Sequence, residues 1–142
     1  MHTYIHEVKY YETDKMGITH HSNYVRWMEE ARLDYLKSLG YGMRQVEERG
    51  ITSPVVSVEC RYKHVTRFDD RIRIELSVEC YTGAKLVFGY TMTNIETGEL
   101  VLEAGSSHCF INGEGRPVAL KKYIPELDSI LKEECESAKA AV

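Results

Sequence analysis

Residues 10–40 read YYETDKMGITHHSNYVRWMEEARLDYLKSLG, and this stretch decides the fold. From Asn23 onward its apolar residues recur with the helical period of 3.6: Tyr24, Trp27, Met28, Ala31, Tyr35 and Leu39. Gly40 follows at the place where many helices end in a left-handed conformation. We therefore predict a long helix whose apolar stripe forms the buried centre of the molecule.

The segment before this helix is short, polar and acidic. Asp14 to Gly17 is typical of a turn, because Asp accepts local backbone hydrogen bonds and Gly tolerates a positive φ. We expect Ser22 or Asn23 to cap the helix with its side chain. Near the free N–H groups of a helix start, the Asp14 carboxylate could serve as a base or nucleophile. These residues alone leave a catalytic Asp and an ordinary turn Asp equally open.

On both sides of the helix, alternation of polar and apolar residues predicts strands. We expect them at residues 2–11, 55–65, 71–81, 85–95 and 99–111, with a short helix near 42–49 and a last helix from Pro125. In 71–81 the apolar set ends with Val78 and Cys80, which are expected to share one face. On the outer face, Val87 and Leu100 or Leu102 suggest a surface for a partner.

The order of these elements predicts an α+β fold. One apolar helix and about five antiparallel strands can bury each other only if a curved sheet wraps the helix. The 142 residues suffice for one hydrophobic core, so we expect residues 1–142 to form a single domain.

Composition narrows the class of protein. A net charge of −4 is not that of a basic nucleic-acid binder. We expect neither a signal peptide nor a membrane span, since no long apolar run is present. Four cysteines occur without a CxxC pair, which indicates reduced thiols and a cytoplasmic protein: Cys60, Cys80, Cys109 and Cys135.

Other polar residues give weaker signals. His20 and His21 are adjacent and lack metal-ligand spacing, so we predict no metal site. His64 and His108 are expected to pack within strands. Glu29 and Arg32 have the spacing of an ion pair on a helix. Lys63 and Arg67 could form a basic rim for a phosphate-bearing ligand.

Three motifs together resemble a known family. The first is Tyr11-x-Thr13-Asp14-x-x-Gly17-x-x-x-His21-x-Asn23-Tyr24, leading into Glu29-x-Ala31-Arg32. The others are Tyr62-x-x-x-x-Arg67-Phe68-Asp69-Asp70 and Asn112-x-x-Gly115-Arg116-Pro117. They resemble the 4-hydroxybenzoyl-CoA thioesterase-like acyl-CoA thioesterases of the hotdog fold.

This resemblance implies a fold, an activity and a set of site residues. In that family a curved sheet wraps a long helix, and subunits assemble as homodimers or homotetramers with active sites between subunits. It implies that Asp14 is the catalytic nucleophile or general base. It also implies that the N–H of His21 polarises the thioester carbonyl, with help from the side chain in the branch of the family that has His here. Gly17, Asn23 and Tyr24 match the motif around the substrate, and coenzyme A belongs to the substrate, so no separate cofactor is expected.

Two alternatives stay open beside acyl-CoA hydrolysis. A hotdog hydratase or dehydratase has His five residues after its Asp, where this chain has Thr19. A non-catalytic acyl-CoA binding module is compatible with the same fold, although such modules often lack the acid that this chain keeps as Asp14. The acyl group is not specified by the sequence.

Overall fold

A computed structural model describes residues 1–140, so the predicted domain limit at residue 142 lies outside them. The helices are α1 (Ser22–Ser38), α2 (Met43–Glu48) and α3 (Pro125–Ala140), and two 3-10 turns are η1 (Tyr10–Glu12) and η2 (Leu120–Lys122). The strands are β1 (His2–Glu7), β2 (Ile51–Thr52), β3 (Val55–Tyr62), β4 (Arg71–Tyr81), β5 (Lys85–Asn94), β6 (Leu100–Cys109) and β7 (Ile111–Asn112).

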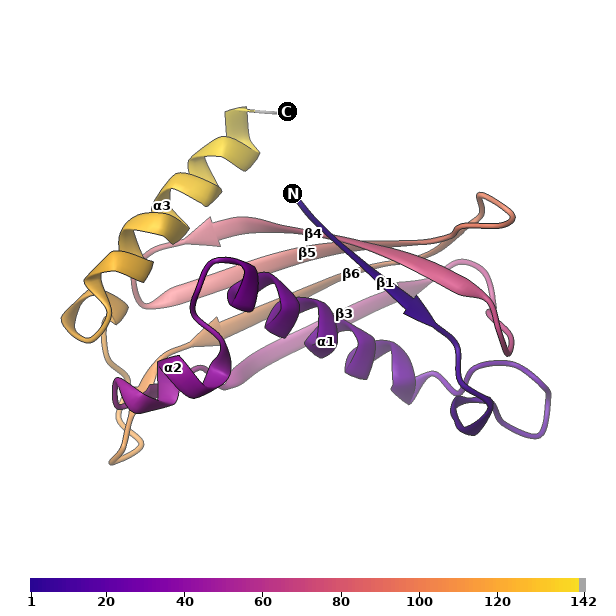
Figure 1. Ribbon diagram of the computed structural model, residues 1–142, viewed down its shortest axis with the longest axis horizontal. Coiled ribbons are helices and arrows are strands. Elements are labelled where there is room, and N and C mark those ends of the chain that lie inside the picture. Colours follow the sequence, from indigo (N-terminus) through magenta and orange to yellow (C-terminus); the bar gives the residue numbers. More distant parts are fainter. Residues whose placement is uncertain (141–142) are drawn as a thin grey trace.

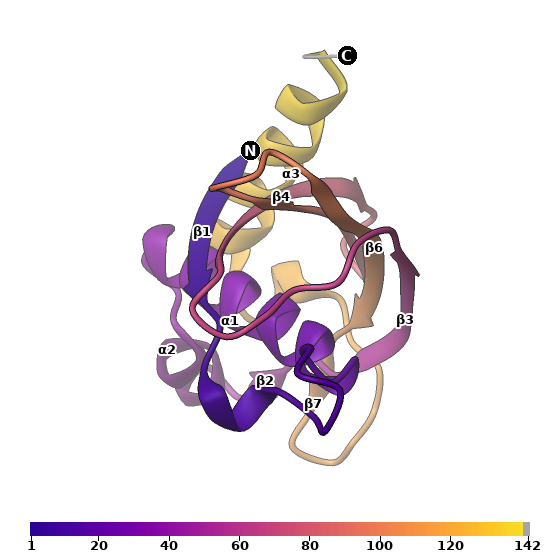
Figure 2. The ribbon, with the colours of Figure 1, turned by 90° about the vertical axis from the view of Figure 1, so that its right-hand side faces the viewer.

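The main sheet has five strands in the order β1-β4-β5-β6-β3, and all neighbours are antiparallel. In Figure 1 the long strands run beside α1, and Figure 2 shows the sheet curving around that helix from β1 to β3. The predicted α+β fold, with a curved sheet of about five strands around a central helix, is therefore confirmed.

The predicted apolar stripe of α1 is buried against the inner face of this sheet. Trp27, Met28 and Ala31 have no exposed surface, and Tyr24 and Tyr35 are at most 5% exposed. Burial of a large apolar side chain contributes roughly 1.5–3 kcal/mol, so this stripe is a main reason that the sheet closes around α1. Gly40 ends the helix with φ +90°, as expected.

A bulge in β6 explains two differences from the predicted strands. Val101 and Leu102 are both buried, so Leu102 does not belong to the outer partner surface that we predicted. At the bulge, the backbone N–H groups of Lys63 and His64 both donate to the Val101 carbonyl. Regular pairing stops there, which is why β3 ends at Tyr62 rather than at residue 65. Apart from Ile5 on β1, the exposed large apolar residues of the sheet lie on β3: Val55, Val56, Val58 and Tyr62.

Other boundaries also shift. β1 ends at Glu7, because Lys9 already begins the η1 turn. A register shift separates Val78 from Cys80, so Cys80 is only half-buried and does not continue the inner face. The pairing of β2 with β7 was not predicted, since two residues are too few to show a period.

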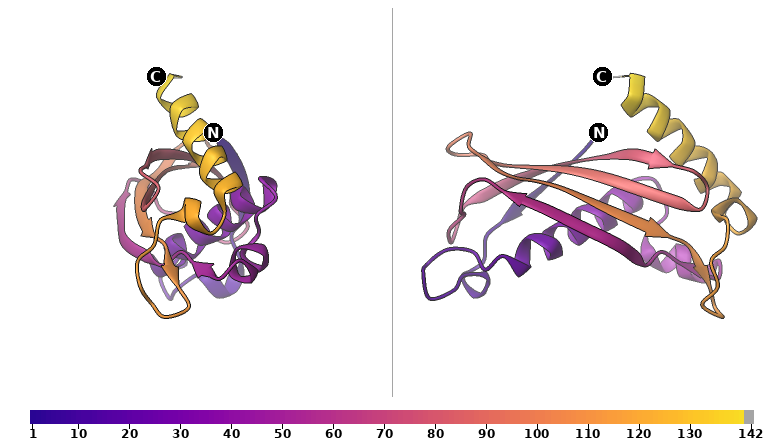
Figure 3. Two further views of the ribbon diagram at one scale, coloured as in Figure 1. Left: turned by 90° about the vertical axis from the view of Figure 1, so that its left-hand side faces the viewer. Right: turned by 180° about the vertical axis from the view of Figure 1, so that it is seen from behind.

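The last helix and the polar loop lie at opposite ends of the sheet. α3 packs on β4, where the Tyr81 hydroxyl donates to Asp128 Oδ1 at 2.5 Å. Figure 3 shows α3 at one end of the long strands and the loop before α1 at the other. The polar loop therefore remains uncovered by the C-terminal helix.

Candidate active site

Asp14 lies in a turn that closes on itself. Its Oδ1 accepts the N–H of Met16 at 2.8 Å, and its backbone carbonyl accepts the N–H of Gly17 at 3.0 Å. The N–H of Asp14 in turn donates to the Ile18 carbonyl at 2.9 Å. Gly17 has φ +77°, a conformation that costs other L-residues about 1–2 kcal/mol. The turn fixes a half-buried Asp14 whose second carboxylate oxygen has no protein partner among residues 1–140.

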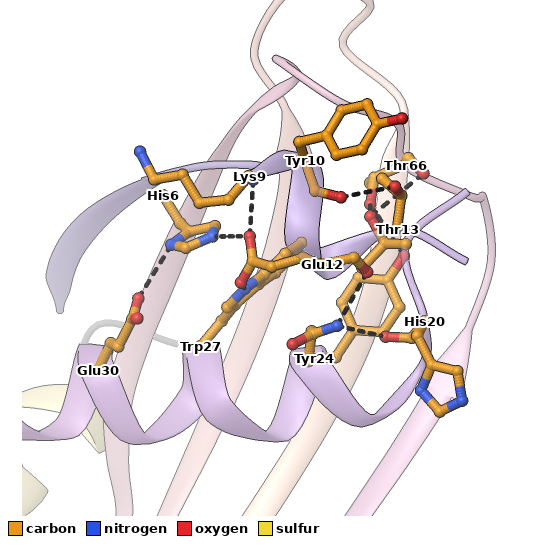
Figure 4. Close-up of polar contacts among 12 residues, drawn as sticks. His6, Lys9, Tyr10, Glu12, Thr13, His20, Tyr24, Trp27, Glu30 and Thr66 are labelled. Carbon is orange, nitrogen blue, oxygen red and sulfur yellow. Dashed lines mark hydrogen bonds and ion pairs between the residues drawn. The ribbon is translucent and has the colours of Figure 1, made fainter. Parts of the chain in front are cut away.

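Glu12 holds this turn on α1. Its side chain is buried, and Figure 4 shows its carboxylate between β1 and the helix. Oε2 accepts the indole N–H of Trp27 at 2.7 Å. Oε1 accepts the N–H of Lys9 and contacts His6 Nε2, both at 2.8 Å. Burial alone would raise the pKa of Glu12, but the hydrogen bonds from Trp27, Lys9 and His6 outweigh it and hold the pKa below its usual value of 4.5.

Glu12 was not among the predicted site residues. A signal for it was present, because a buried Trp normally needs an acceptor for its N–H, and Trp27 is the only Trp of the chain. That acceptor lies 15 residues away in the sequence, so helical spacing could not reveal it.

The start of α1 differs from the predicted side-chain cap. His21 stands at the cap position without a side-chain capping bond. The Asn23 amide points back and donates to the carbonyls of Glu12, at 2.9 Å, and His20, at 3.2 Å. Ser22 Oγ contacts His20 Nδ1 at 2.9 Å. The capping prediction was therefore wrong, because both side chains are engaged by the preceding loop.

One backbone donor at this helix start is left unused. The N–H groups of Ser22, Asn23 and Tyr24 all have acceptors in the loop or first turn. Within residues 1–140, the N–H of His21 has none. Since a helix N-terminus carries partial positive charge, this N–H suits a carbonyl oxygen on which negative charge develops.

A pocket of about 200 Å³ lies between the start of α1 and the end of β3. It is lined by Ile18, Thr19, His21, Tyr24, Tyr62, Lys63, His64 and Val65. The structure thus brings together three predicted site residues, His21, Tyr24 and Lys63. Asp14 and Gly17 lie in the adjoining turn, and Asn23 is buried beneath it. Arg67 is exposed and does not line this pocket.

Thr66 joins the pocket wall to the loop and is fully buried. Its hydroxyl lies 2.6 Å from Thr19 Oγ1 and 3.0 Å from the Tyr24 hydroxyl. Its carbonyl accepts the N–H of Thr19 at 2.8 Å. Burial raises the pKa of Tyr24, although the hydrogen bonds to Thr66 act the other way, so Tyr24 is a neutral hydrogen-bonding residue here.

The two adjacent histidines are exposed. Their rings stack with centroids 4.5 Å apart. Among the residues that the structure describes, no group of three or more His, Cys, Asp and Glu is placed to hold a metal ion.

Comparison with known proteins places this chain in a family. The family model described as thioesterase-like superfamily matches residues 8–133. The chain belongs to this superfamily. The resemblance seen in the sequence motifs is therefore confirmed.

Similar proteins support the same conclusion. Bacillus subtilis (strain 168) has a protein named "Putative acyl-CoA thioesterase YneP", 38% identical over 121 residues that cover 84% of this chain and 87% of that protein. The acyl-CoA thioesterase YbgC of Haemophilus influenzae is 27% identical over 118 residues, 82% of this chain and 86% of that protein. The crystal structure of a DHNA-CoA thioesterase from Staphylococcus aureus matches with a TM-score of 0.91 and 30% identity, over 99% of this chain and 93% of that one. This thioesterase superfamily member thus has the hotdog fold that we expected.

Proposed function

We propose that this protein hydrolyses an acyl-CoA thioester to a free acid and coenzyme A. The observation that carries the proposal is that the loop before α1 holds two unengaged groups, the second carboxylate oxygen of Asp14 and the N–H of His21, beside a pocket at the start of α1. Related proteins that are named acyl-CoA thioesterases support it.

In the proposed reaction, the N–H of His21 binds the thioester oxygen and stabilises the negative charge of the tetrahedral intermediate. Asp14 acts in one of two ways. As a nucleophile it bonds to the carbonyl carbon, the C–S bond breaks, and water hydrolyses the resulting anhydride. As a general base it takes a proton from the attacking water, and the thiolate of coenzyme A leaves.

The other predicted residues have supporting roles in this proposal. Gly17 allows the turn that presents Asp14, and Asn23 ties the loop to α1. Tyr24 and the exposed His21 side chain form the pocket wall. Lys63, with Arg67 farther along the loop, is our candidate for the phosphates of coenzyme A. The reaction needs no cofactor beyond the coenzyme A of its substrate.

The free edge of β3 supports a homodimer as the working form, with a homotetramer as a larger assembly. β3 is an edge of the sheet, and exposed strand edges are normally covered or protected. Val55, Val56, Val58 and Tyr62 are 38–65% exposed on it. We propose that two copies pair their β3 edges antiparallel, which places the pocket at the end of β3 between subunits.

A cytoplasmic location is part of the same proposal. All four cysteines are free thiols, which suits a reducing compartment. No helix within residues 1–140 is long and apolar enough to cross a membrane.

The hydratase alternative receives no support from the site. Thr19, at the position where such enzymes have His, is buried and hydrogen-bonded to Thr66. It is therefore not free to exchange a proton with a substrate.

The test is thiol release from a panel of acyl-CoAs by the wild type and Asp14→Asn. We expect the variant to lose about 10²–10⁴-fold in turnover while its circular dichroism is unchanged. Asp34→Asn is the matched control, since Asp34 lies farther along α1, contacts His2 of β1 and does not line the pocket. Near-normal turnover by Asp14→Asn would contradict the assignment. Saturable acyl-CoA binding by the wild type without thiol release would favour the binding module.

A further inference from the structure

A second cavity lies away from the pocket at the start of α1. It has a volume of about 250 Å³ and lies between the later turns of α1, strands β5 and β6, and α3. Its walls are mainly Leu, Phe, Val and Met side chains, but Glu29, Ser53, Arg32 and His108 also line it. Of these four, Arg32 and His108 carry side-chain N–H donors. Buried polar residues in an apolar cavity commonly fix the orientation of a ligand, so these two residues are informative.

Arg32 does not make the predicted ion pair with Glu29. Its Nη1 donates instead to the Tyr90 hydroxyl at 3.0 Å, and the side chain is half-buried. No ion pair joins Arg32 to a carboxylate anywhere in residues 1–140. Because a guanidinium has five N–H donors and cannot accept, Arg32 retains donors at the cavity wall.

A chain of hydrogen bonds fixes the state of His108. The Tyr90 hydroxyl lies 2.5 Å from Ser106 Oγ, which lies 2.8 Å from His108 Nε2. Arg32 can only donate, so Tyr90 accepts from it and donates its own O–H to Ser106, the other group within hydrogen-bond distance. Ser106 then donates to His108 Nε2.

His108 is neutral under ordinary conditions. Burial, with the nearby charge of Arg32, lowers its pKa from 6.5 to about 4. With Nε2 accepting from Ser106, the ring proton must sit on Nδ1. Nδ1 has no hydrogen-bond partner within residues 1–140, and these residues contain no fully enclosed side-chain nitrogen or oxygen without a partner. Nδ1–H is therefore a donor accessible from the cavity, beside Arg32.

The position of β3 relates this cavity to the proposed catalytic pocket. Ser53, Pro54 and Val55 line the cavity at the start of β3, whereas Tyr62 and Lys63 line the pocket at its end. Within one subunit these ends are separated by about 23 Å at 3.3 Å per residue, too far for a compact acyl group. Antiparallel pairing of two β3 edges brings the start of one strand beside the end of the other. The cavity of one subunit then adjoins the pocket of its partner.

We propose that this cavity binds the acyl group and selects compact acyl chains whose far end carries a hydrogen-bond-accepting oxygen, held by Arg32 and His108. The inference rests on the proposed thioesterase activity and adds a substrate class. A volume of 250 Å³ equals about eight water-sized groups, which suits a short chain or ring rather than a long fatty acyl chain. A plain alkyl end leaves the Arg32 and His108 donors unpaired, which is costly in a buried site.

The test compares three acyl-CoAs with the same six-carbon chain: hexanoyl-CoA, 6-hydroxyhexanoyl-CoA and adipoyl-CoA. We expect wild-type kcat/KM for at least one oxygen-tipped substrate to exceed that for hexanoyl-CoA by about tenfold or more. The preferred tip distinguishes a hydroxyl from a carboxylate as the bound group. In Arg32→Met we expect this ratio to fall to about one. Arg44→Met, an exposed Arg on α2, should keep both the ratio and the turnover.

The outcomes separate this inference from the proposed function. Wild-type hydrolysis of all three substrates at equal kcat/KM overturns the inference and leaves the thioesterase proposal intact. If no substrate releases thiol, the thioesterase proposal fails, and calorimetry then measures the affinity of the same three acyl-CoAs. Binding of an oxygen-tipped acyl-CoA about tenfold or more tighter than hexanoyl-CoA supports the inference, and equal affinities overturn it. If Arg32→Met fails to fold, Arg32→Lys replaces it, because Lys keeps the charge but cannot form the planar fork. An unchanged ratio in the folded variant overturns the role of Arg32.

Discussion

Replacing Glu12 by Gln tests whether a buried carboxylate holds the loop before α1, the proposed active-site loop, on the helix. The two oxygens of Glu12 meet three donors, Trp27 Nε1, the N–H of Lys9 and His6 Nε2, at 2.7–2.8 Å. Gln has the same shape, but one of its oxygens becomes an amide nitrogen that only donates. If its oxygen faces Lys9 and His6, its amide faces the Trp27 N–H. The opposite orientation leaves the other two donors facing the amide.

The expected loss of stability follows from the number of hydrogen bonds that Gln cannot accept at this position. At least one hydrogen bond to a charged acceptor is lost, worth about 1.5–3 kcal/mol, and a buried donor is left without an acceptor. Removal of a buried charge offsets part of the loss. We therefore expect Glu12→Gln to lower the free energy of unfolding by about 2–4 kcal/mol, a large share of the stability of a typical domain.

The effect has a defined pH dependence. The folded-state pKa of Glu12 lies below its usual value of 4.5. A carboxyl group of this kind stabilises the folded protein above its unfolded-state pKa, and this contribution is lost as pH falls through the folded-state value. The difference in the free energy of unfolding between wild type and Glu12→Gln should therefore be largest at neutral pH and become smaller in acid, because protonated Glu12 resembles Gln.

Urea unfolding followed by the fluorescence of Trp27, the only Trp, measures this difference at one protein concentration. With a slope of about 2 kcal/mol/M, the midpoint should fall by about 1–2 M at neutral pH. Circular dichroism serves as a second probe, because Trp27 itself contacts Glu12. Glu7→Gln is the control, since Glu7 is exposed on β1 and should shift stability by less than about 0.5 kcal/mol. A midpoint shift of less than about 0.3 M at neutral pH would refute the reasoning, and so would a midpoint difference in acid equal to that at neutral pH.

Three further changes have expected outcomes. Gly17→Ala should lower the free energy of unfolding by about 1–2 kcal/mol, measured by thermal unfolding, because φ is +77° and the added Cβ meets nothing within 4 Å. Gly98→Ala is the control, since φ there is +75° and the added Cβ has equal space. Both variants should lose the same stability, but only the Gly17 variant should lose turnover. Burial lowers the pKa of His108 from 6.5 to about 4, so protonation of this residue favours the unfolded state. The free energy of unfolding should therefore be unaffected by His108 above pH 6.5 and fall by roughly 3 kcal/mol towards pH 4. Urea unfolding at several pH values measures this slope, and His108→Gln should remove it. Thr66→Val removes a buried hydroxyl bonded to Thr19, so urea unfolding should show a loss of about 1–3 kcal/mol, and an unchanged midpoint would contradict the structural role of this contact.

The fold could be predicted because its deciding signals are local. The 3.6 period in residues 24–39 and the alternation in 71–81 each define which face is buried, without knowledge of the partner element. The errors fall where a distant residue sets the outcome. β3 ends early because two of its neighbouring N–H groups share the Val101 carbonyl, and nothing near residue 62 in the sequence announces a bulge almost forty residues later.

The candidate site was predictable only in part for the same reason. The Asp14 turn is local, with its bonds spanning two to four residues, and its residue types indicate it. Glu12 and Thr66 act through contacts with Trp27 and Thr19, at separations of 15 and 47 residues. Helix spacing predicted that Arg32 would pair with Glu29, but a surface pair of this kind is worth only a few tenths of a kcal/mol. A hydrogen bond to Tyr90 in a partly buried position is stronger, so the long-range partner prevails.

The arrangement of satisfied and unsatisfied groups explains why the proposed chemistry belongs at the boundary of loop and helix. The loop is anchored by Glu12 on α1 and by Thr19 on Thr66, so it has little freedom to relax. A donor that is held in place without a protein partner loses nothing when a reacting oxygen arrives, whereas a donor in water must first reorganise its surroundings. The N–H of His21 meets this condition, and so do the remaining N–H donors of Arg32 and the Nδ1–H of His108 at the second cavity. In a chain whose described residues leave no fully enclosed side-chain polar atom unpaired, a substrate can engage these accessible donors without breaking an existing hydrogen bond of the protein.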